Sequence, residues 1–196
     1  MVWRGKSKIE ERERFSHEAL DHLDHLYRVA FHLAREPAEA RDLVQETYLR
    51  ALDSFEQFSP GTNMKAWLTR ILYNFFLDLY HQRKKWVSLE GKGSTEEEGV
   101  DYWERVAGED PGPENSFLVK ELKIKISEAL RKIPEEFRAP IVLVDMGELS
   151  YAEAAEVLSC PLGTIRSRLS RGRRYLHMHL KRYMGLEGER GRKRQK

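Results

Sequence analysis

The chain has 196 residues, of which 40% are hydrophobic and 34% are charged, and it contains a single cysteine. This composition is too polar for one thick core and fits small helical bundles, whose surface is large relative to their volume. A single cysteine excludes an intramolecular disulfide framework and indicates a reducing compartment. Because the sequence has no run of about 18 apolar residues and begins with a charged stretch, we expect no membrane span, no signal peptide and a cytoplasmic location.

The net charge of +2 is unevenly divided along the chain. Residues 1–88 carry 14 basic and 13 acidic side chains, residues 89–115 carry 2 and 9, and residues 116–196 carry 18 and 10. The three parts therefore have net charges of +1, −7 and +8. A basic part behind an acidic bridge indicates nucleic-acid contact at one end, although a merely solvated surface is the plainer interpretation.

The amino-terminal part has the pattern of a helical domain. Apolar residues recur at helical intervals and strand-like alternation is absent, which predicts helices at about 16–35, 38–55 and 63–85. The composition then changes abruptly over residues 89–115, which are rich in Gly, Pro and acidic residues and predict a flexible acidic linker.

Helical periodicity resumes after this linker. We expect further helices at about 116–132, 134–146, 150–158 and 162–183. The predicted fold class is therefore all-α, with two small helical domains at residues 1–88 and 116–184 joined by the linker. A basic tail at residues 185–196 is expected to be disordered.

The stretch "MKAWLTRILYNFFLDLYHQRKK" predicts a helix with two distinct faces. One broad apolar face belongs in a core and consists of Leu68, Ile71, Leu72, Phe75, Phe76 and Leu79. Across from it lie Trp67, Arg70, Asn74, Asp78 and His81. A Trp, an Arg and an Asn on one exposed face are suited to stack and hydrogen-bond unpaired bases, although a Trp such as Trp67 is more often partly buried core than a stacking platform.

The preceding helix, "ARDLVQETYLRALDSF", predicts an inward face that contains Val44 and Tyr48. Asp42, Glu46 and Asp53 lie outward in one narrow arc. Such acidic residues are either a solvated face or a docking surface for a basic partner.

The segment from residue 150 to residue 183 has the pattern of a helix-turn-helix. Ser150 and Glu153 fit a capping box at the start of a short alanine-rich helix. "SCPLG" then predicts a turn that contains Pro161 and Gly163, and a basic helix follows. A second helix with a polar, basic free face is typical of one that enters a DNA major groove.

This basic helix, "IRSRLSRGRRYL", also has two faces. Ile165, Leu169, Gly172, Leu176 and Leu180 fall on one stripe that must cover the preceding helices. The opposite arc consists of Arg166, Ser167, Ser170, Arg171 and Arg174. Since like charges three and four residues apart repel, this face predicts an anionic partner outside the chain, and DNA is favoured over a membrane surface or an acidic protein groove.

No enzymatic constellation competes with this interpretation. The sequence has no glycine-rich phosphate loop, no nucleophile beside a base and no carboxylate cluster with metal spacing. His22 and His25 are one turn apart and His32 follows, but no second ligand pair accompanies them, so we predict neither a metal site nor a cofactor. Cys160 is interpreted as a small turn residue rather than a redox switch.

Three segments together resemble one known family. "DLVQETYLRAL", then "WLTRILYNFFLD" with "HQRKK", then "IPEEFRAPIVLVDMGELSYAEAAEVLSCPLGTIRSRLSRGRRYL" resemble the extracytoplasmic-function group of bacterial RNA polymerase sigma factors. The resemblance covers about residues 15–182. It implies an alternative sigma factor without catalysis of its own, stress-responsive and controlled by an anti-sigma factor, with region 2 in the first domain and region 4 in the second.

The resemblance also implies partners and site residues. Core RNA polymerase would be bound through the clamp helices of its largest subunit and its flap, the clamp contact being made by Asp42, Leu43, Gln45, Glu46 and Leu49. The minus-ten promoter element would be opened by a base pocket and the helix behind it, formed by Ser59, Pro60, Gly61, Thr62, Asn63, Trp67, Arg70, Asn74, Asp78 and His81. The minus-thirty-five element would be read by Thr164, Arg166, Ser167, Arg168, Ser170, Arg171 and Arg174.

Some positions depart from the family pattern. His81 stands where an arginine is common, which makes a phosphate contact doubtful or pH dependent. Ser170 is small where some members carry a ring, so its base preference is expected to differ. The basic tail is longer than the family pattern and is assigned only sequence-independent phosphate attraction.

Two other functions remain open at the level of the sequence. One is a free-standing helix-turn-helix repressor whose first half serves dimerisation or effector binding. The other is an adaptor that binds proteins through its acidic surfaces and touches DNA phosphates without specificity. Loss of discrimination at defined base positions, as opposed to uniform weakening, separates a base reader from the adaptor.

Overall fold

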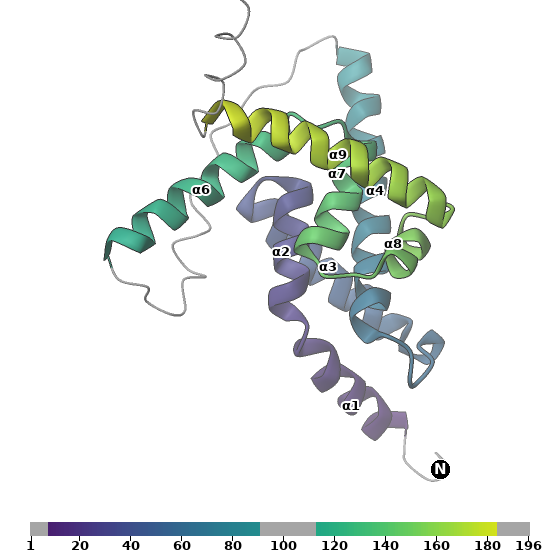
Figure 1. Cartoon of the computed structure of the whole chain (residues 1–196). Helices are drawn as coiled ribbons and strands as arrows, with labels where there is room; N and C mark the ends of the chain where they lie inside the picture. Colours follow the sequence, from purple (N-terminus) through teal and green to yellow (C-terminus); the bar gives the residue numbers. More distant parts are fainter. Residues whose placement is uncertain (1–7, 91–112, 184–196) are drawn as a thin grey trace, which may run out of the picture.

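The computed structural model of the chain describes residues 8–90 and 113–183 (Figure 1). The elements are α1 (Lys8–Leu20), α2 (Leu23–Ala34), α3 (Pro37–Asp53), the short 3-10 turn η1 (Phe55–Gln57), α4 (Met64–Glu90), α6 (Pro113–Arg131), α7 (Glu135–Ile141), the π-helical turn η2 (Val142–Met146), α8 (Tyr151–Val157) and α9 (Leu162–Tyr183). No strand occurs among the described residues, so the predicted all-α class is confirmed. Of the linker predicted at residues 89–115, residues 91–112 lie outside the described residues, while its two ends belong to α4 and α6. The tail predicted at residues 185–196 also lies outside the described residues.

The prediction of one helix at 16–35 is wrong, because two helices, α1 and α2, meet at Asp21 and His22. The backbone N–H of His22 donates to the carbonyl oxygen of Ala19 at 3.1 Å and closes a tight turn. The hydroxyl of Tyr48, on α3, donates to the same carbonyl oxygen at 3.0 Å. A side chain 29 positions away therefore occupies a carbonyl at which the first helix ends.

The bend between α2 and α3 is set by two neighbouring backbone features. Arg35 ends α2 in the left-handed conformation, with φ of 71°, and its N–H donates to the carbonyl oxygen of Phe31. Pro37 then begins α3, where its fixed φ suits a first helical position and its missing N–H leaves no bond unmade. The two helices consequently fold back on each other and pack along their lengths.

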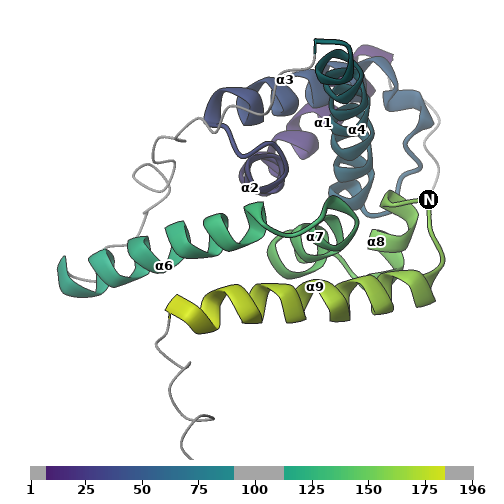
Figure 2. The same cartoon turned by 90° about the horizontal axis from the view of Figure 1, so that it is seen from above.

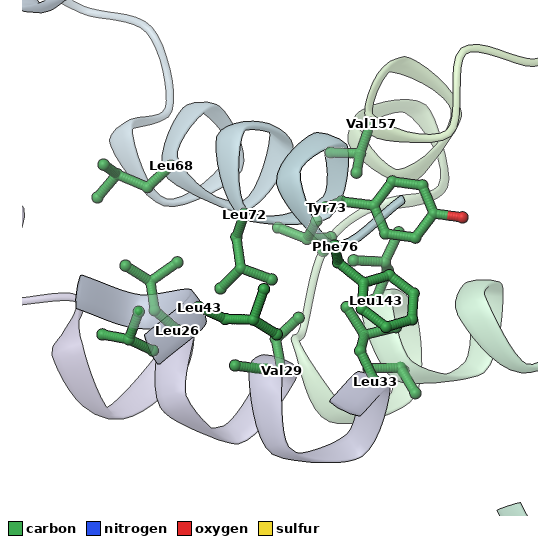
Figure 3. Packing of buried hydrophobic residues seen from close by; sticks show 14 of the residues in the cluster. Leu26, Val29, Leu33, Leu43, Leu68, Leu72, Tyr73, Phe76, Leu143 and Val157 are labelled. Atoms are coloured by element: carbon green, nitrogen blue, oxygen red, sulfur yellow. The ribbon is translucent and has the colours of Figure 1, made fainter. Parts of the chain in front are cut away.

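The amino-terminal bundle, α1 to α4, is closed by large aliphatic side chains. Leu26, Leu43, Leu68 and Leu72 have essentially no exposed surface, and Figure 3 shows them between α2, α3 and α4. Burying such a side chain stabilises a fold by about 1.5–3 kcal/mol. The bundle therefore holds the long helix α4 at a fixed angle and leaves its far side free.

A histidine inside this bundle is hydrogen-bonded and held neutral. His25 is 7% exposed, and its Nε2 lies 2.8 Å from the hydroxyl of Thr69. That hydroxyl donates to the carbonyl oxygen of Lys65, so it accepts the proton of His25. Burial, with the positive charge of Lys65 nearby, lowers the pKa of His25 to about 3, and burial lowers the pKa of His32 to about 4.

The carboxyl-terminal bundle, α6 to α9, has a core of its own. Leu130, Ile133, Ile141 and Leu169 form a buried cluster between α6, α7 and α9. Gly172 allows α9 to lie directly on α7, because a Cβ at this position would meet the carbonyl oxygen of Phe137 at 2.5 Å. This close packing fixes the direction of the basic helix.

The two bundles also pack on each other. One continuous apolar cluster includes residues of both, and Figure 3 shows Leu143 beside Leu33 and Phe76, and Val157 beside Tyr73. Along this interface η2 contacts α2, and α8 contacts α4. Seen from above, α7 and α8 lie between the amino-terminal bundle and α9 (Figure 2). The basic helix is thus the outermost layer of the molecule.

Charged side chains border the apolar interface. Glu135, on α7, forms an ion pair with the buried Arg138 and faces Arg35 of α2. Burial raises the pKa of Glu135 to about 7, and the charge of Arg35 opposes that rise. The contact between the bundles is therefore partly ionic as well as apolar.

Candidate nucleic-acid interface

The basic helix α9 has the two faces that the sequence predicts. Ile165 and Leu169 are wholly buried beneath it. The opposite face is exposed and consists of Arg166, Ser167, Ser170, Arg171 and Arg174. The guanidinium groups of Arg166, Arg171 and Arg174 make no ion pair with any residue in the described part of the chain. A forked row of donors is therefore left available to an external anion.

Thr164 and Arg168 lie at the edge of this face and are half-buried. The carbonyl oxygen of Thr164 accepts a hydrogen bond from the hydroxyl of Ser167 at 2.9 Å. This bond holds one of the small hydroxyls in the first turns of the helix. The predicted reading residues thus share one continuous surface, and their proposed roles on DNA stay a prediction.

One arginine of α9, which the sequence did not single out, serves the fold instead. Two nitrogens of Arg173 donate hydrogen bonds to the carboxylate of Asp145, Nε to Oδ2 at 3.0 Å and Nη2 to Oδ1 at 2.6 Å. Hydrogen bonding to Asp145, with a further contribution from Tyr151, raises the pKa of Arg173 well above its ordinary value. The pair ties α9 to η2 and helps to set the angle of the exposed face.

The predicted capping box at the start of α8 is confirmed. The hydroxyl of Ser150 accepts from the N–H of Glu153 at 3.2 Å, and Oε2 of Glu153 accepts from the N–H of Ser150 at 2.8 Å. Desolvation opposes ionisation of Glu153, but hydrogen bonds from Ser150 and Asn63 outweigh it and lower its pKa. The carboxylate is therefore ionised at neutral pH. The turn after α8 contains Cys160, which is half-buried against the apolar cluster.

The polar face of α4 is exposed along three turns. Arg70, Asn74, Asp78 and His81 are all exposed, at successive positions on one side of the helix. Trp67, predicted on the same face, is half-buried, and its ring contacts those of Phe15 and Phe58 at centroid distances of 5.7 and 5.4 Å. Trp67 therefore supports the aromatic cluster and keeps only part of its surface open to solvent.

The loop before α4 borders an open cavity of about 530 Å³. Ser59, Pro60, Gly61, Thr62 and Asn63 are all exposed in this loop. Gly61 has φ of 90°, a conformation that favours glycine, and Pro60 and Gly61 form one wall of the cavity. Its floor is aromatic and its rim is charged, formed by Phe15, Phe55, Phe58, Lys8, Glu11, Arg14, Glu18 and Glu56. Aromatic rings beside a polar loop are a suitable place for an unstacked base.

The predicted polymerase-binding residues on α3 differ in their exposure. Asp42, Gln45 and Leu49 are exposed, and Leu49 retains 52% of its surface. Glu46 is half-buried and bonded to Nε of Arg50 at 2.8 Å. Leu43 is wholly buried between the helices, so the prediction that it contacts a partner is wrong: it stabilises α3 from the inside.

Two further properties concern the described residues only. Within residues 8–90 and 113–183, no helix is both long and apolar enough to cross a membrane. In the same ranges no three His, Cys, Asp or Glu side chains gather where they could hold a metal ion.

Known families match both parts of the chain. Residues 19–87 match Sigma-70 region 2, and residues 123–176 match Sigma-70 region 4, together more than half of the chain. The ECF RNA polymerase sigma factor SigE of Mycolicibacterium smegmatis is 40% identical over 81% of this chain, which spans 58% of that relative. The ECF RNA polymerase sigma factor EcfG of Rhodopseudomonas palustris is 35% identical over 74% of this chain and 72% of the relative.

Solved structures are similar over most of the chain. The sigma factor RpoE of Bartonella quintana, solved with the anti-sigma factor NepR, has a TM-score of 0.67 at 28% identity and covers 86% of this chain and 98% of its own. CnrH, solved with the cytosolic domain of CnrY, has a TM-score of 0.61 at 22% identity, covers 87% and 89%, and supports the fold alone. The matches to region 2 and region 4, in this order on one chain, show that it belongs to the ECF group of the sigma-70 family of RNA polymerase sigma factors.

Proposed function

We propose that the chain is an alternative sigma factor that binds core RNA polymerase and directs it to promoters. The observation that carries this proposal is the pair of exposed polar faces, one on α9 of the helix-turn-helix and one on α4. Neither face is used by the described fold. A polymerase that lacks promoter recognition gains it from such a subunit, which needs no catalytic group of its own. A factor in this role works in the cytoplasm, where transcription takes place.

In this proposal α9 reads the minus-thirty-five element in the major groove. Arg166 and Arg171 are placed to engage base edges because their planar forks fit guanine O6 and N7, and each good pair discriminates by about 1–3 kcal/mol. Thr164 and Arg168, at the edge of the face, are assigned to phosphates.

The opening of the minus-ten element is assigned to the other bundle. The cavity beside Pro60 and Gly61 supports capture of an unstacked base. Arg70 and Asn74, exposed on α4, are assigned to contacts with the same separated DNA strand. Trp67 contributes the edge of its ring rather than an open stacking face. His81, exposed further along the same face of α4, is assigned to a backbone phosphate.

Docking on polymerase is assigned to the exposed residues of α3. Asp42 and Gln45 offer polar contacts and Leu49 offers an apolar one, to the clamp helices of the largest subunit, while the carboxyl-terminal bundle meets the flap. Each reader domain alone buries only about 600–1,000 Å² on DNA and binds weakly. Tethering both domains to one polymerase makes the second contact nearly intramolecular and raises avidity.

Control by an anti-sigma factor follows from the relatives. The sigma factor RpoE of Bartonella quintana was solved with the anti-sigma factor NepR. We extend this mode of control to the present chain and assign the anti-sigma factor to the same surfaces that polymerase and DNA use. The acidic segment at residues 89–115 is proposed as a linker that lies in the basic channels of the polymerase through which nucleic acid passes.

The proposal is tested by transcription in vitro with core polymerase on a library of randomised promoters. We expect a defined set of templates to start, and Arg166→Ala and Arg171→Ala to lose discrimination at defined upstream positions. His177→Ala, an exposed position of the same helix that is not among the assigned residues, is the control. Footprints without core enzyme would indicate a free-standing repressor, and equal weakening on every sequence would indicate an adaptor.

A further inference from the structure

Helix α1 presents an apolar side chain that the fold does not use. Ile9 retains 70% of its surface, more than any other large apolar side chain in the part of the chain that the structure describes. The buried residues of α1 are Phe15 and Ala19. At about 100° per residue, Ile9 points about 120° away from Phe15 around the helix axis. Its exposure is therefore set by its position on α1, and the core does not cover it.

Ile9 forms one wall of an open cavity between α1 and α3. The cavity has a volume of about 430 Å³, and its other apolar walls are Leu52, on α3, and Phe55, on η1. Leu52 lines this cavity and not the one beside Pro60 and Gly61. Three apolar walls around an open space suit an apolar group. The cavity can therefore hold an apolar side chain of a partner.

The charges around this cavity balance. Nζ of Lys8 forms an ion pair with Oε1 of Glu56 at 2.5 Å. Arg12 and Asp53 complete the rim with one charge of each sign. A neutral rim gives a phosphate backbone no electrostatic advantage, in contrast to the exposed face of α9. The cavity is therefore a better site for a protein side chain than for DNA.

The cavity adjoins the exposed residues of α3. Leu49, which is 52% exposed, precedes Leu52 by three residues, so the two side chains are neighbours on the helix surface. They are separated by about 4.5 Å along the helix axis. An apolar path thus leads from Leu49 over Leu52 to α1. Asp53 borders the cavity and also belongs to the acidic arc of α3, formed by Asp42, Glu46 and Asp53, which suits a basic partner.

Most of helix α1 lies outside the family match. Residues 8–18 precede the residues 19–87 that match Sigma-70 region 2. The likeness to region 2 therefore gives these residues no role, and their surface has to be judged by its chemistry. An exposed apolar patch that is bordered by polar residues marks a site of protein interaction.

We propose that α1 belongs to the polymerase-docking surface: the cavity formed by Ile9, Leu52 and Phe55 receives an apolar side chain of the clamp helices, while the acidic arc of α3 contacts their basic side chains. This inference rests on the proposed function and extends its docking surface from one helix to two. An anchor side chain that is held in a pocket carries a large share of the binding energy of an interface. The affinity for core polymerase thus depends on residues that precede region 2.

The test is the affinity of the full chain for core polymerase, measured by a quantitative pull-down titration. We expect Ile9→Ala to weaken this affinity about five- to thirtyfold, because the side chain loses carbon atoms that the partner buries. The folded-to-unfolded ratio of Ile9→Ala in urea should change by less than about threefold, since Ile9 is exposed. Leu23→Ala is the matched control. Leu23 is exposed at the start of α2 and lines neither cavity, so its affinity should stay within about twofold of the parent.

A second measurement identifies the occupant of the cavity directly. A benzophenone amino acid in place of Ile9 should crosslink to the largest subunit when the complex with core polymerase is irradiated. The matched control carries the same amino acid in place of Arg14, which is on the same helix but lines the cavity beside Pro60 and Gly61. This control should not crosslink to the largest subunit.

Unchanged affinity of Ile9→Ala would overturn the inference, and so would a crosslink from position 9 to promoter DNA or to another subunit. Leu49→Ala is titrated in parallel and separates the inference from the proposed function. If Leu49→Ala weakens binding and Ile9→Ala does not, only the inference fails. If the parent chain does not bind core polymerase at all, the proposed function fails and the inference fails with it.

Discussion

The contact of α9 with α7 at Gly172 makes a quantitative prediction. In Gly172→Ala the new Cβ would lie 2.5 Å from the carbonyl oxygen of Phe137 and 2.8 Å from Cδ1 of Ile141. Ordinary van der Waals contact begins at 3.4 Å, so α9 must move away from the carbonyl by about 0.9 Å. The closest blocking atom is backbone, which cannot rotate aside as a side chain would.

Two opposing terms set the size of the effect. Overpacking a core by one methyl group costs about 1–3 kcal/mol. Replacing a helical glycine with alanine stabilises the folded state by about 1 kcal/mol, because alanine loses less backbone entropy on folding. We therefore expect Gly172→Ala to lower the free energy of unfolding by up to about 2 kcal/mol and to weaken binding to the minus-thirty-five duplex, since the exposed face is displaced.

The assay is urea unfolding followed by far-ultraviolet circular dichroism, with Gly163→Ala as the matched control. Gly163 is also on α9, but a Cβ there meets no atom within 4 Å. We expect Gly163→Ala to be neutral or stabilising by up to about 1 kcal/mol. Equal stability of the two variants would refute the reasoning, because only the predicted contact at Gly172 separates them.

Three further predictions concern other parts of the molecule. Leu43→Ala is expected to lower the free energy of unfolding by about 2–5 kcal/mol in urea unfolding. Leu49→Ala should change that free energy by less than about 0.5 kcal/mol and yet weaken binding to core polymerase in a pull-down. A destabilising Leu49→Ala would contradict the exposed position. Asp145→Asn should lower stability by about 0.5–1 kcal/mol at low salt and by less at high salt, because its bond to Arg173 is partly exposed. Because the pKa of His25 is lower in the folded than in the unfolded chain, the stability that it contributes is present above about pH 6.5 and is lost as pH falls. The free energy of unfolding should be about 2 kcal/mol lower at pH 5 than at pH 7.5. In His25→Gln, measured by urea unfolding at both pH values, this difference should be smaller.

The faces of α9 could be predicted from the sequence because one helical period decides both burial and exposure. Ile165 and Leu169 lie on one side and Arg166 and Arg171 on the other, whatever the helix packs against. The capping box at Ser150 was equally predictable, because all its partners lie within three residues.

Other features depend on contacts between distant residues and have no local signal. The break between α1 and α2 involves the hydroxyl of Tyr48, and a hydrogen bond between Asn63 and Glu153 joins positions 90 apart. Leu43 was assigned to a docking surface through the family resemblance, but the helical period turns it inward. Arg173 could not be distinguished by sequence from the neighbouring exposed arginines, yet it pairs with Asp145 within the chain.

The position of α9 as the outermost layer has an evolutionary consequence. The exposed face of α9 and the surface that packs on the amino-terminal bundle are centred on different side chains: Arg166 and Arg171 lie on the first, Leu143 and Val157 on the second. Substitutions on the exposed face can therefore change what α9 binds without disturbing the packing between the bundles. Duplicated copies within one genome are free to diverge in these two traits independently.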